Sequence, residues 1–475
     1  MANIRDQCSW VHMQEPDKAT IKAKDLLRMA LAKSRLLEPL QMGSLAIRKA
    51  ALIIGGGLAG MSSALELANQ GFAVLLVEKQ AELGGNLRRI RHLFDGEDPA
   101  KLLETMIARV TAHPLIRIFT AAKIERMEGS IGNYKTKIST NGTVHEVEHG
   151  VVIIASGAKE YAPREYLYGQ DERVITQREL EDKIASSGKR FLARNGNKPT
   201  TVVMIQCVGS RDEERPSCSR ICCSEAVKNA LKIKECSPET AVYVLYQDVR
   251  TYGFKEKYYT QARQKGVAFI RWDKETGPEV VKVARRLNVR VFDQILRIPI
   301  EIPADLVVLS TGVVANEDNK TIAQFVKVPI TQEGFFLEAH MKLRPVDFAT
   351  DGVFLCGLAH SPKLIEESVI QAQAAAARAA TILSRDHIEL DANISRVVDE
   401  NCDGCAYCVD PCPYKAVTLF EYMWQGSTKK VVEVNESLCH GCGTCMATCP
   451  KRGVFVKSFT LDQIQAQLDS ALQGA

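Results

Sequence analysis

Eight of the fifteen cysteines stand in two identical runs near the end of the chain. In each run three cysteines are separated by two residues, and a fourth follows after three more and precedes a proline. The runs are Cys402, Cys405, Cys408 and Cys412, then Cys439, Cys442, Cys445 and Cys449. Thiolates repeated at this spacing can enclose an iron–sulfur cubane.

This pattern is typical of two-cluster ferredoxins, in which the fourth cysteine of each run ligates the other cluster. The predicted ligand sets are Cys402, Cys405, Cys408 and Cys449 for one [4Fe–4S] cluster, and Cys439, Cys442, Cys445 and Cys412 for the other. Gly404, Gly441 and Gly443 permit a tight backbone that turns N–H groups towards sulfur. Zinc is the competing interpretation, but it needs only two cysteine pairs.

Four further cysteines form a less regular group in the middle of the chain: Cys207, Cys218, Cys222 and Cys223. Helical spacing predicts that Cys218 and Cys222 share one helix face, with Cys223 beside them. Cys207 ends a predicted strand, at the sheet edge where α/β proteins bind ligands. We predict that this group holds a third [4Fe–4S] cluster. Buried inert cysteines or a redox disulfide are the alternatives.

A glycine-rich turn provides a different chemistry near residue 55. Gly55, Gly57 and Gly60 form G-x-G-x-x-G between a predicted strand (50–54) and a predicted helix (58–70). These glycines allow a tight turn, a close approach of backbone to a pyrophosphate and close helix–strand packing. Glu78 ends the next predicted strand, where a carboxylate can accept a hydrogen bond from a ribose hydroxyl. The pattern predicts a dinucleotide site.

Neighbouring motifs resemble the flavoprotein class of thioredoxin reductase and glutathione reductase, which implies that this site holds FAD. The motifs are Glu78-Lys79, Leu83-Gly84-Gly85-Asn86, two strand-plus-glycine segments ending at Gly157 and Gly312, and residues 350–357. After Gly357 that class usually has aspartate, whereas this chain has Leu358. The implied FAD-binding residues are Gly55, Gly57, Gly60, Glu78, Lys79, Gly84, Gly85, Asn86, Gly157, Gly312, Gly357, Leu358 and Lys363.

The second nucleotide site of that class is degenerate in this chain. Its glycine-rich turn corresponds to Gln206-Cys207-Val-Gly209-Ser-Arg211, where one glycine survives and a cysteine occupies the turn. We therefore expect no tight binding of NAD(P)H. A flavin without a nicotinamide partner must exchange electrons with another group.

The central string Cys207-Val-Gly-Ser-Arg-Asp, followed by Cys218-Ser-Arg-Ile-Cys222-Cys223, resembles the flavin-binding and iron–sulfur A subunit of heterodisulfide reductase. Residues 3–12 and 246–254 resemble that family too, so the likeness covers nearly the whole chain. It implies a short form, without the further cluster-binding portions of full-length members. Cys8 is then a rival to Cys207 as fourth ligand of the central cluster.

Lys363 is the predicted catalytic residue. It stands in Ser361-Pro362-Lys363, after the segment that resembles the flavin-closing segment, and in the family a lysine of the matching Pro-Lys pair lies near the flavin. A lysine there could stabilise the anionic reduced ring or hydrogen-bond to it. The alternative is a solvated surface lysine.

Apolar runs and helical segments alternate through most of the chain, which predicts an α/β fold with parallel sheets. Together with the motifs it predicts a thioredoxin-reductase-like two-dinucleotide-binding fold followed by a ferredoxin domain. The predicted domains are an N-terminal helical segment (1–44, with a helix at 17–40), an FAD-binding domain in two parts (45–190 and 301–388), a central α/β domain (199–300) and the ferredoxin domain (390–475).

The composition excludes several classes of protein. The net charge of +4 gives no reason to expect nucleic acid as a partner. The uncharged run 50–65 is too short and too rich in glycine to span a membrane, and the start resembles no signal peptide. We expect a cytoplasmic protein with reduced thiols.

The predicted function is electron transfer among FAD, iron–sulfur clusters and partner subunits. The resemblance implies a heterodisulfide-reductase-like complex containing a homodimer of this chain, with ferredoxin or hydrogenase- or dehydrogenase-type electron donors. Flavin-based electron bifurcation is implied by the resemblance alone. The alternatives are a stand-alone flavin-dependent dithiol/disulfide oxidoreductase, and a scaffold with a structural flavin.

Overall fold

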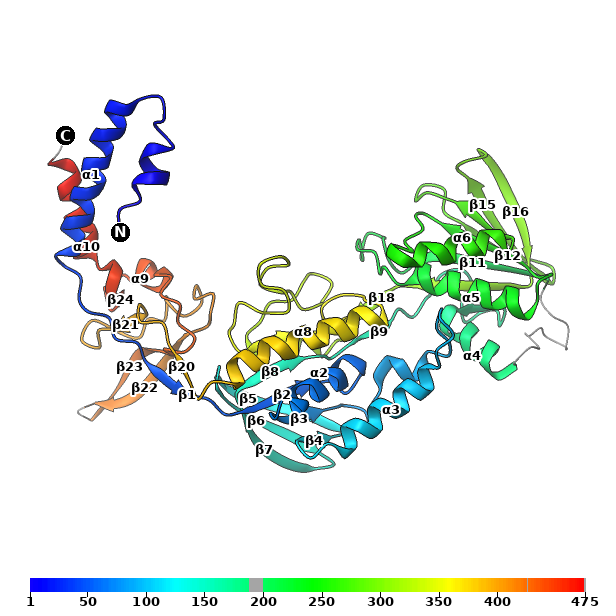
Figure 1. The fold of residues 1–475 in the computed structure, drawn as a ribbon, viewed down its shortest axis with the longest axis horizontal. Helices are drawn as coiled ribbons and strands as arrows, with labels where there is room; N and C mark the ends of the chain where they lie inside the picture. Colours follow the sequence, from blue (N-terminus) through cyan, green and yellow to red (C-terminus); the bar gives the residue numbers. More distant parts are fainter. Residues whose placement is uncertain (188–199, 425, 474–475) are drawn as a thin grey trace. The chain divides into compact units, whose positions relative to one another are not determined.

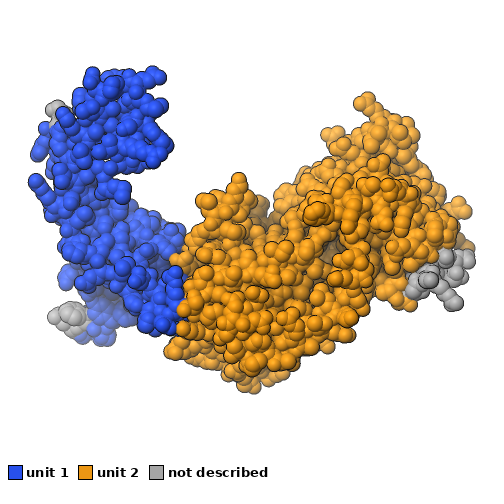
Figure 2. All heavy atoms as spheres, viewed as in Figure 1, with its two compact units in different colours: residues 1–47, 130–132, 385–475 blue, residues 48–129, 133–384 orange. Residues whose placement is uncertain are grey.

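The computed structural model describes residues 1–187, 200–424 and 426–473. The chain forms two compact units (Figure 2). The smaller comprises residues 1–47, 130–132 and 385–475, and the larger comprises residues 48–129 and 133–384. Among the described residues no helix is long and apolar enough to cross a membrane.

The first sheet of the larger unit has five parallel strands, in the order β19 (Val353–Leu355), β8 (Val151–Ile154), β2 (Ala50–Ile54), β3 (Ala73–Val77) and β4 (Ile116–Phe119). The helices α2 (Leu58–Asn69), α3 (Pro99–Ala112) and α8 (Ile365–Leu383) pack against it, with α2 and α8 side by side (Figure 1). The central strand is buried from Ala51 onward because an unbroken apolar run suits a strand covered on both faces. The predicted β-α-β unit is present.

A second five-stranded parallel sheet has the order β10 (Val174–Thr176), β17 (Leu306–Thr311), β11 (Thr201–Val208), β12 (Ala241–Tyr246) and β13 (Val267–Arg271). The helices α4 (Gln177–Ser187), α5 (Cys222–Cys236) and α6 (Glu256–Gln264) accompany it. Its core includes Met204, Ala230 and Val308, all fully buried. This sheet brings the end of β11, with Cys207, next to the start of α5.

Antiparallel elements complete the larger unit. One three-stranded sheet consists of β5 (Ala122–Ser130), β6 (Asn133–Thr140) and β7 (Thr143–His149), and another of β14 (Glu279–Val283), β15 (Arg286–Asp293) and β16 (Ile298–Ala304). A two-stranded ribbon pairs β9 (Ala158–Glu160) with β18 (Val313–Ala315). This ribbon lies where the chain passes between the two parallel sheets, and α7 (Asn319–Val326) follows it.

Strand pairing differs from the predicted domain boundaries at two places. The sequence predicts Val174–Thr176 in the first part of the FAD-binding domain and Leu306–Thr311 in the second part, yet both strands pair within the central sheet. The physical reason is that β17 inserts between β10 and β11, so the crossing points lie at the β9–β18 ribbon. The predicted boundary at residues 188–199 lies outside the described residues.

The smaller unit joins the two ends of the chain. Its strands pair antiparallel as β1 (Ser44–Ala46) with β20 (His387–Glu389), β21 (Ser395–Val397) with β24 (Val454–Val456), and β22 (Val417–Trp424) with β23 (Ser427–Val434). Its described helices are the π-helical turn η1 (Arg5–Ser9), α1 (Pro16–Ser34), α9 (Thr444–Thr448), the 3₁₀ turn η6 (Lys457–Phe459) and α10 (Leu461–Leu472). The predicted N-terminal segment therefore does not stand alone, because α1 packs on α10 and β1 pairs with β20. The predicted helix 17–40 ends earlier, at Ser34.

Candidate cofactor sites

The glycine turn after β2 is tight on one side and open on the other. A Cβ on Gly55 would lie 2.3 Å from the Ala155 carbonyl oxygen, and one on Gly60 would lie 1.8 Å from the Gly55 carbonyl oxygen. A Cβ on Gly57, the N-cap of α2, would approach only the Gly85 Cα, at 4.0 Å. The glycine at this position therefore leaves room for a ligand, beside the free N–H groups of a helix N-terminus.

A second glycine pair closes against this turn. Gly84 donates its N–H to the Gly56 carbonyl at 2.8 Å, and both Gly84 and Gly85 have positive φ. The buried Glu78 carboxylate accepts from the Gly56 N–H at 2.6 Å and from the Gln80 N–H at 2.8 Å. A carboxylate has about four acceptor sites, so Glu78 retains capacity for a ribose hydroxyl.

The other residues predicted to bind FAD lie on segments that surround the first sheet. Asn86 donates to the Ala158 carbonyl at 3.0 Å, and Lys79 pairs with Asp318 at 2.7 Å. Gly157 has positive φ. The space where its Cβ would be is open, like the corresponding space at Gly57. Gly357 lies against Ala59 in the first turn of α2, and Leu358 follows it half-buried. Gly312 instead packs on the central sheet, where an added Cβ would lie 2.7 Å from the Gly209 carbonyl oxygen.

The corresponding turn of the central sheet is closed by a side chain. A Cβ on Gly209 would lie 2.0 Å from the Tyr161 ring, and Gly209 has a φ of +68°. The Arg215 guanidinium stacks over the same tyrosine, 4.5 Å from the ring centroid. Tyr161 therefore occupies the position over this turn that stays open at Gly57.

The central thiols come together at this closed turn. Burial, then Cys223 and Cys218, raise the pKa of Cys207 to about 12. Burial also raises the pKa values of Cys222 and Cys223, and each of these thiols adds to the effect on its neighbours. The predicted helical position of Cys218 is wrong, because α5 begins only at Cys222. The segment before α5 is a loop, in which Arg220 has a φ of +61°.

The backbone around these thiols has the shape of an anion site. Cys207, Gly209, Arg211 and Arg220 all have positive φ. Left-handed residues next to right-handed ones turn N–H groups into one concavity, a geometry found at iron–sulfur sites. The Arg220 N–H already donates to the Cys218 sulfur at 3.3 Å. Among the described residues, the buried Ser224 hydroxyl in the first turn of α5 has no hydrogen-bond partner. These features fit a group that carries sulfur acceptors.

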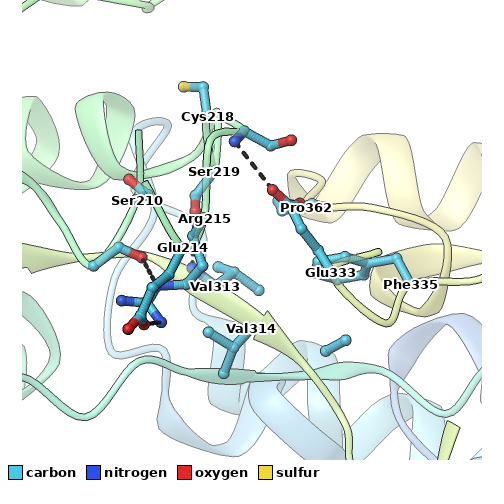
Figure 3. A pocket seen from close by; sticks show the side chains of 13 residues that line it. Ser210, Glu214, Arg215, Cys218, Ser219, Val313, Val314, Glu333, Phe335 and Pro362 are labelled. Atoms are coloured by element: carbon cyan, nitrogen blue, oxygen red, sulfur yellow. Dashed lines mark hydrogen bonds and ion pairs between the residues drawn. The ribbon is translucent and has the colours of Figure 1, made fainter. Parts of the chain in front are cut away.

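A pocket of about 330 Å³ opens beside this group (Figure 3). Cys218, Gly209 and residues 313–315 contribute to its wall, and Glu333 and Pro362 lie across from Cys218. Glu333 Oε1 accepts from the Ser217 N–H at 3.1 Å. The sequence did not predict this pocket because its walls come from segments far apart in the chain. The motif ending at Gly312 was the nearest available signal.

Lys363 lies half-buried between the 3₁₀ turn η5 (Gly357–Ala359) and α8. Its Nζ is 3.1 Å from His360 Nδ1 and donates to the Ser361 hydroxyl at 2.6 Å. Burial, then the nearby Arg220 guanidinium, lower its pKa to about 8. Lys363 is thus partly buried, and its contact with a flavin stays a prediction.

Several ferredoxin cysteines lie close enough to raise one another's pKa values. Burial, then Cys445, Cys449 and Cys402, raise the pKa of Cys408 to about 11. Burial raises the pKa of Cys445, with contributions from Cys439 and Cys442. The two fourth cysteines make equivalent bonds: Cys412 accepts from the Ala416 N–H at 3.3 Å and Cys449 from the Gly453 N–H at 3.2 Å. Cys405 and Cys442 are exposed.

Within the described part of the chain, no three His, Cys, Asp or Glu side chains are close enough to hold one metal ion. Cysteines that ligate a cubane bind different irons at its corners, so they stand further apart than the ligands of a single ion. N–H groups aimed at Cys412, Cys439 and Cys449 supply the hydrogen bonds that stabilise cluster sulfur. The donor set therefore fits cubanes better than a single zinc ion.

Cys8 lies in the smaller unit, buried, where its thiol donates to the Ala19 carbonyl of α1 at 2.8 Å. The central thiols belong to the larger unit. The rivalry between Cys8 and Cys207 for the central cluster therefore stays a prediction.

Comparison with known proteins matches two regions of the chain to domain families. A family model described as a 4Fe-4S dicluster domain matches residues 401–452, and one described as an NAD(P)-binding Rossmann-like domain matches residues 53–113. The thioredoxin reductases of Lactococcus lactis and T. acidophilum align with 71% of this chain at 17% and 16% identity, with TM-scores of 0.48 and 0.46, and the alignments cover 99% and 98% of those chains.

Two relatives match over most of their length. The chain is 37% identical to the second iron–sulfur A subunit of the CoB–CoM heterodisulfide reductase of Methanopyrus kandleri, over 89% of this chain and 77% of that protein. It is 36% identical to the A subunit of the H(2):CoB-CoM heterodisulfide,ferredoxin reductase of Methanothermobacter marburgensis, over 99% of this chain and 83% of that protein.

The two parallel sheets and the two matched domains define an α/β oxidoreductase with a Rossmann-like dinucleotide-binding fold and a C-terminal ferredoxin domain. The predicted fold class and enzyme class are thereby confirmed. The chain belongs to the family of heterodisulfide reductase A subunits. The resemblance carried by the central cysteine string is confirmed as well.

Proposed function

We propose that this chain is the FAD and iron–sulfur electron-transfer subunit of a heterodisulfide-reductase-like complex. One observation carries the proposal: the Cβ position of Gly57 is open at the N-terminus of α2 in the turn after β2, whereas Tyr161 lies over Gly209 in the turn after β11. The first turn is open beside Gly57, whereas the second is covered by Tyr161 and carries the thiols of Cys207, Cys222 and Cys223. A flavin at the first turn then has thiol-bound iron as its neighbour in place of a nicotinamide.

In this proposal FAD lies on the turn after β2. Gly57 and the N-terminus of α2 face its pyrophosphate, Glu78 faces a ribose, and Gly357 borders the flavin end. When bound, FAD supplies exchange of both one and two electrons, which links a pair donor to one-electron clusters. Lys363 provides a positive charge at the ring, held by residues described below.

The proposed clusters number three. Two use the crossed ligand sets of the ferredoxin domain, and the third uses Cys207, Cys218, Cys222 and Cys223. Their N–H donors set the reduction potentials by stabilising charge on sulfur. Cluster ligation needs thiolates that stay reduced, so we propose a cytoplasmic location.

Partner subunits complete the electron path. The relatives include the A subunit of a ferredoxin/F(420)H(2)-dependent CoB-CoM heterodisulfide reductase from Methanosarcina acetivorans, 31% identical over 88% of this chain and 64% of that protein. We propose ferredoxin, or a hydrogenase- or dehydrogenase-type donor, as the electron source. We also propose a homodimer of this chain within a larger complex, and bifurcation at the flavin.

Metal and flavin content of protein purified without oxygen tests this function. Three cubanes require about twelve irons per FAD, whereas two require about eight. Zinc in the cysteine runs, or a nicotinamide nucleotide in place of FAD, would refute the proposal. A flavin that cannot be reduced through the clusters would support a scaffold.

One observation favours a second candidate function. The pocket of about 330 Å³ reaches Cys218, so a small disulfide could approach the central thiols directly. A stand-alone dithiol/disulfide oxidoreductase of this kind would contain about eight irons per FAD. Its central cysteines would also react with a thiol reagent in the purified protein, which cluster ligands would not.

A further inference from the structure

Lys363 is the first of three polar groups that lie in a line. Lys363 Nζ lies 3.1 Å from His360 Nδ1, and His360 Nε2 lies 3.4 Å from Glu338 Oε1. The imidazole is 20% exposed and the carboxylate 11% exposed, so both are shielded from bulk water. His360 and Lys363 lie on the segment after η5, and Glu338 lies on the loop after α7. The fold brings these two segments together.

The hydrogen bonds of Gln371 fix the orientation of the imidazole. Gln371 Oε1 accepts from the Gly357 N–H at 2.8 Å, so the amide nitrogen of Gln371 points to His360 Nδ1, 2.9 Å away. Nδ1 thus receives donors from both Gln371 and Lys363, and it must be the unprotonated nitrogen. The ring proton then sits on Nε2, directed at the Glu338 carboxylate.

The charges that face Lys363 make its proton easy to move. Arg220 approaches from the loop before α5, and Glu367, Glu338 and the Cys356 thiol oppose its effect. Arg220 is itself held by Glu367 at 2.9 Å and by the Tyr252 hydroxyl at 2.7 Å. Burial and the positive charge of Lys363 also lower the pKa of His360, so the imidazole stays neutral and free to accept.

We propose that Lys363, His360 and Glu338 form a proton path. The path carries a proton away from the flavin when electrons leave it and returns the proton when electrons come back. The inference rests on the proposed function, because it places the flavin beside Lys363. The Nζ–H bond of Lys363 breaks as an Nδ1–H bond forms on His360. The Nε2–H proton passes to Glu338, and the lysine amine takes the proton that the reduced flavin gives up as it is oxidised. The two electrons go to the clusters, and reduction reverses every step.

The His360→Ala variant tests the path through flavin oxidation by the clusters. In the anaerobic, cofactor-loaded protein the rate should fall on the order of 10²-fold, the usual contribution of a positioned proton carrier. Added imidazole should restore the rate, and the solvent deuterium isotope effect should increase in its absence. His360→Gln keeps hydrogen-bonding groups but cannot pass a proton between two ring nitrogens, so it should be equally slow.

His340→Ala is the matched control. His340 lies exposed in the same loop as Glu338, and its Nδ1 accepts from the backbone N–H groups of Lys342 and Leu343. This variant should oxidise at the wild-type rate. Wild-type rates in both His360 variants, with no rescue by imidazole, would overturn the path while leaving FAD binding and the proposed function intact.

A measurement on the flavin-free protein tests the proton path separately from the proposed function. Nitrogen-15 spectra of histidine-labelled apoprotein, assigned by the loss of one signal in His360→Ala, should show a neutral ring protonated at Nε2. Glu338→Gln should leave the fold unchanged but slow flavin oxidation in the loaded protein. A ring protonated at Nδ1 would overturn the proposal whatever the flavin content.

Discussion

The larger unit contains two parallel sheets, each with a glycine-containing turn after a central strand, and the proposed function assigns the two turns different cofactors. Each parallel sheet has a central strand that ends in a glycine-containing turn followed by a helix. After β2, the turn leaves space at Gly57 and presents the free N–H groups of α2. After β11, the turn at Gly209 is filled by Tyr161, and the following segment carries cysteines.

In the proposed function, this difference converts a nucleotide site into a cluster site without a change in the sheet. Parallel strands bring their carboxyl ends to one edge, so whatever follows them faces a ligand. Small residues there admit a pyrophosphate, whereas a tyrosine excludes it. Thiols at the same edge, surrounded by left-handed residues such as Arg211 and Arg220, suit a cluster instead.

The largest expected effect comes from filling the open turn. Gly57→Val should abolish FAD binding, because the new side chain enters space that only a ligand would occupy. Flavin absorbance of the purified variant measures this, and the apoprotein should remain folded. Gly277→Ala is the control, since its Cβ would meet Trp272 at an ordinary 3.8 Å. Full flavin content in Gly57→Val would place the cofactor elsewhere.

Removal of single thiols tests the closed turn against the ferredoxin domain. Cys222→Ala should lower the iron content from about twelve to about eight per FAD, because a cubane with three thiolates is lost during purification. Cys405→Ala should lower it equally, and the double variant should retain about four. FAD should stay bound in all three variants. Unchanged iron content in Cys222→Ala would contradict the proposed central cluster.

A smaller effect is expected from crowding the closed turn. Gly209→Ala should lower the free energy of unfolding by about 1–3 kcal/mol, because the residue has positive φ and its Cβ would overlap the Tyr161 ring. Thermal or denaturant unfolding measures it. Adding Tyr161→Ala should recover the part due to overlap, while the part due to φ remains. An additive double variant would show that Tyr161 does not fill the turn.

The smallest effect concerns the titration of Lys363, whose pKa of about 8 lies below the usual 10.5. Between these values the unfolded chain binds the extra proton, so the free energy of unfolding should rise with pH across that window. Acylation of Lys363 in the apoprotein, followed by mass spectrometry, should show a midpoint near 8, and Arg220→Ala should raise it. A midpoint at 10.5 in the unaltered protein would contradict the burial of this lysine.

The sequence predicted the parts of the fold that depend on local pattern. The strand Ala73–Val77 and the helix that begins at Leu58 follow from apolar runs and the glycine turn, and they appear within a residue of expectation. The ferredoxin cysteines are similarly local, because their spacing alone defines their neighbours. The confirmed family also follows from a short string around Cys207.

Other features depend on packing between distant segments and could not be predicted. Nothing in Val174–Thr176 says which sheet will accept so short a strand, and the structure pairs it with β17. Cys218 fits helical spacing with Cys222, but it lies in the loop around Arg220, before the helix begins at Cys222. Tyr161 over Gly209, and Glu338 behind His360, arise only when separate segments meet.

The central claim is that electrons pass between flavin and cubanes inside one chain. Rapid mixing of the oxygen-free protein with reduced ferredoxin, followed by flavin absorbance, tests it most directly when wild type is compared with Cys405→Ala at equal FAD content. The account predicts that the wild-type flavin is reduced quickly and that the variant loses most of that rate. Equal rates in the two proteins would contradict it.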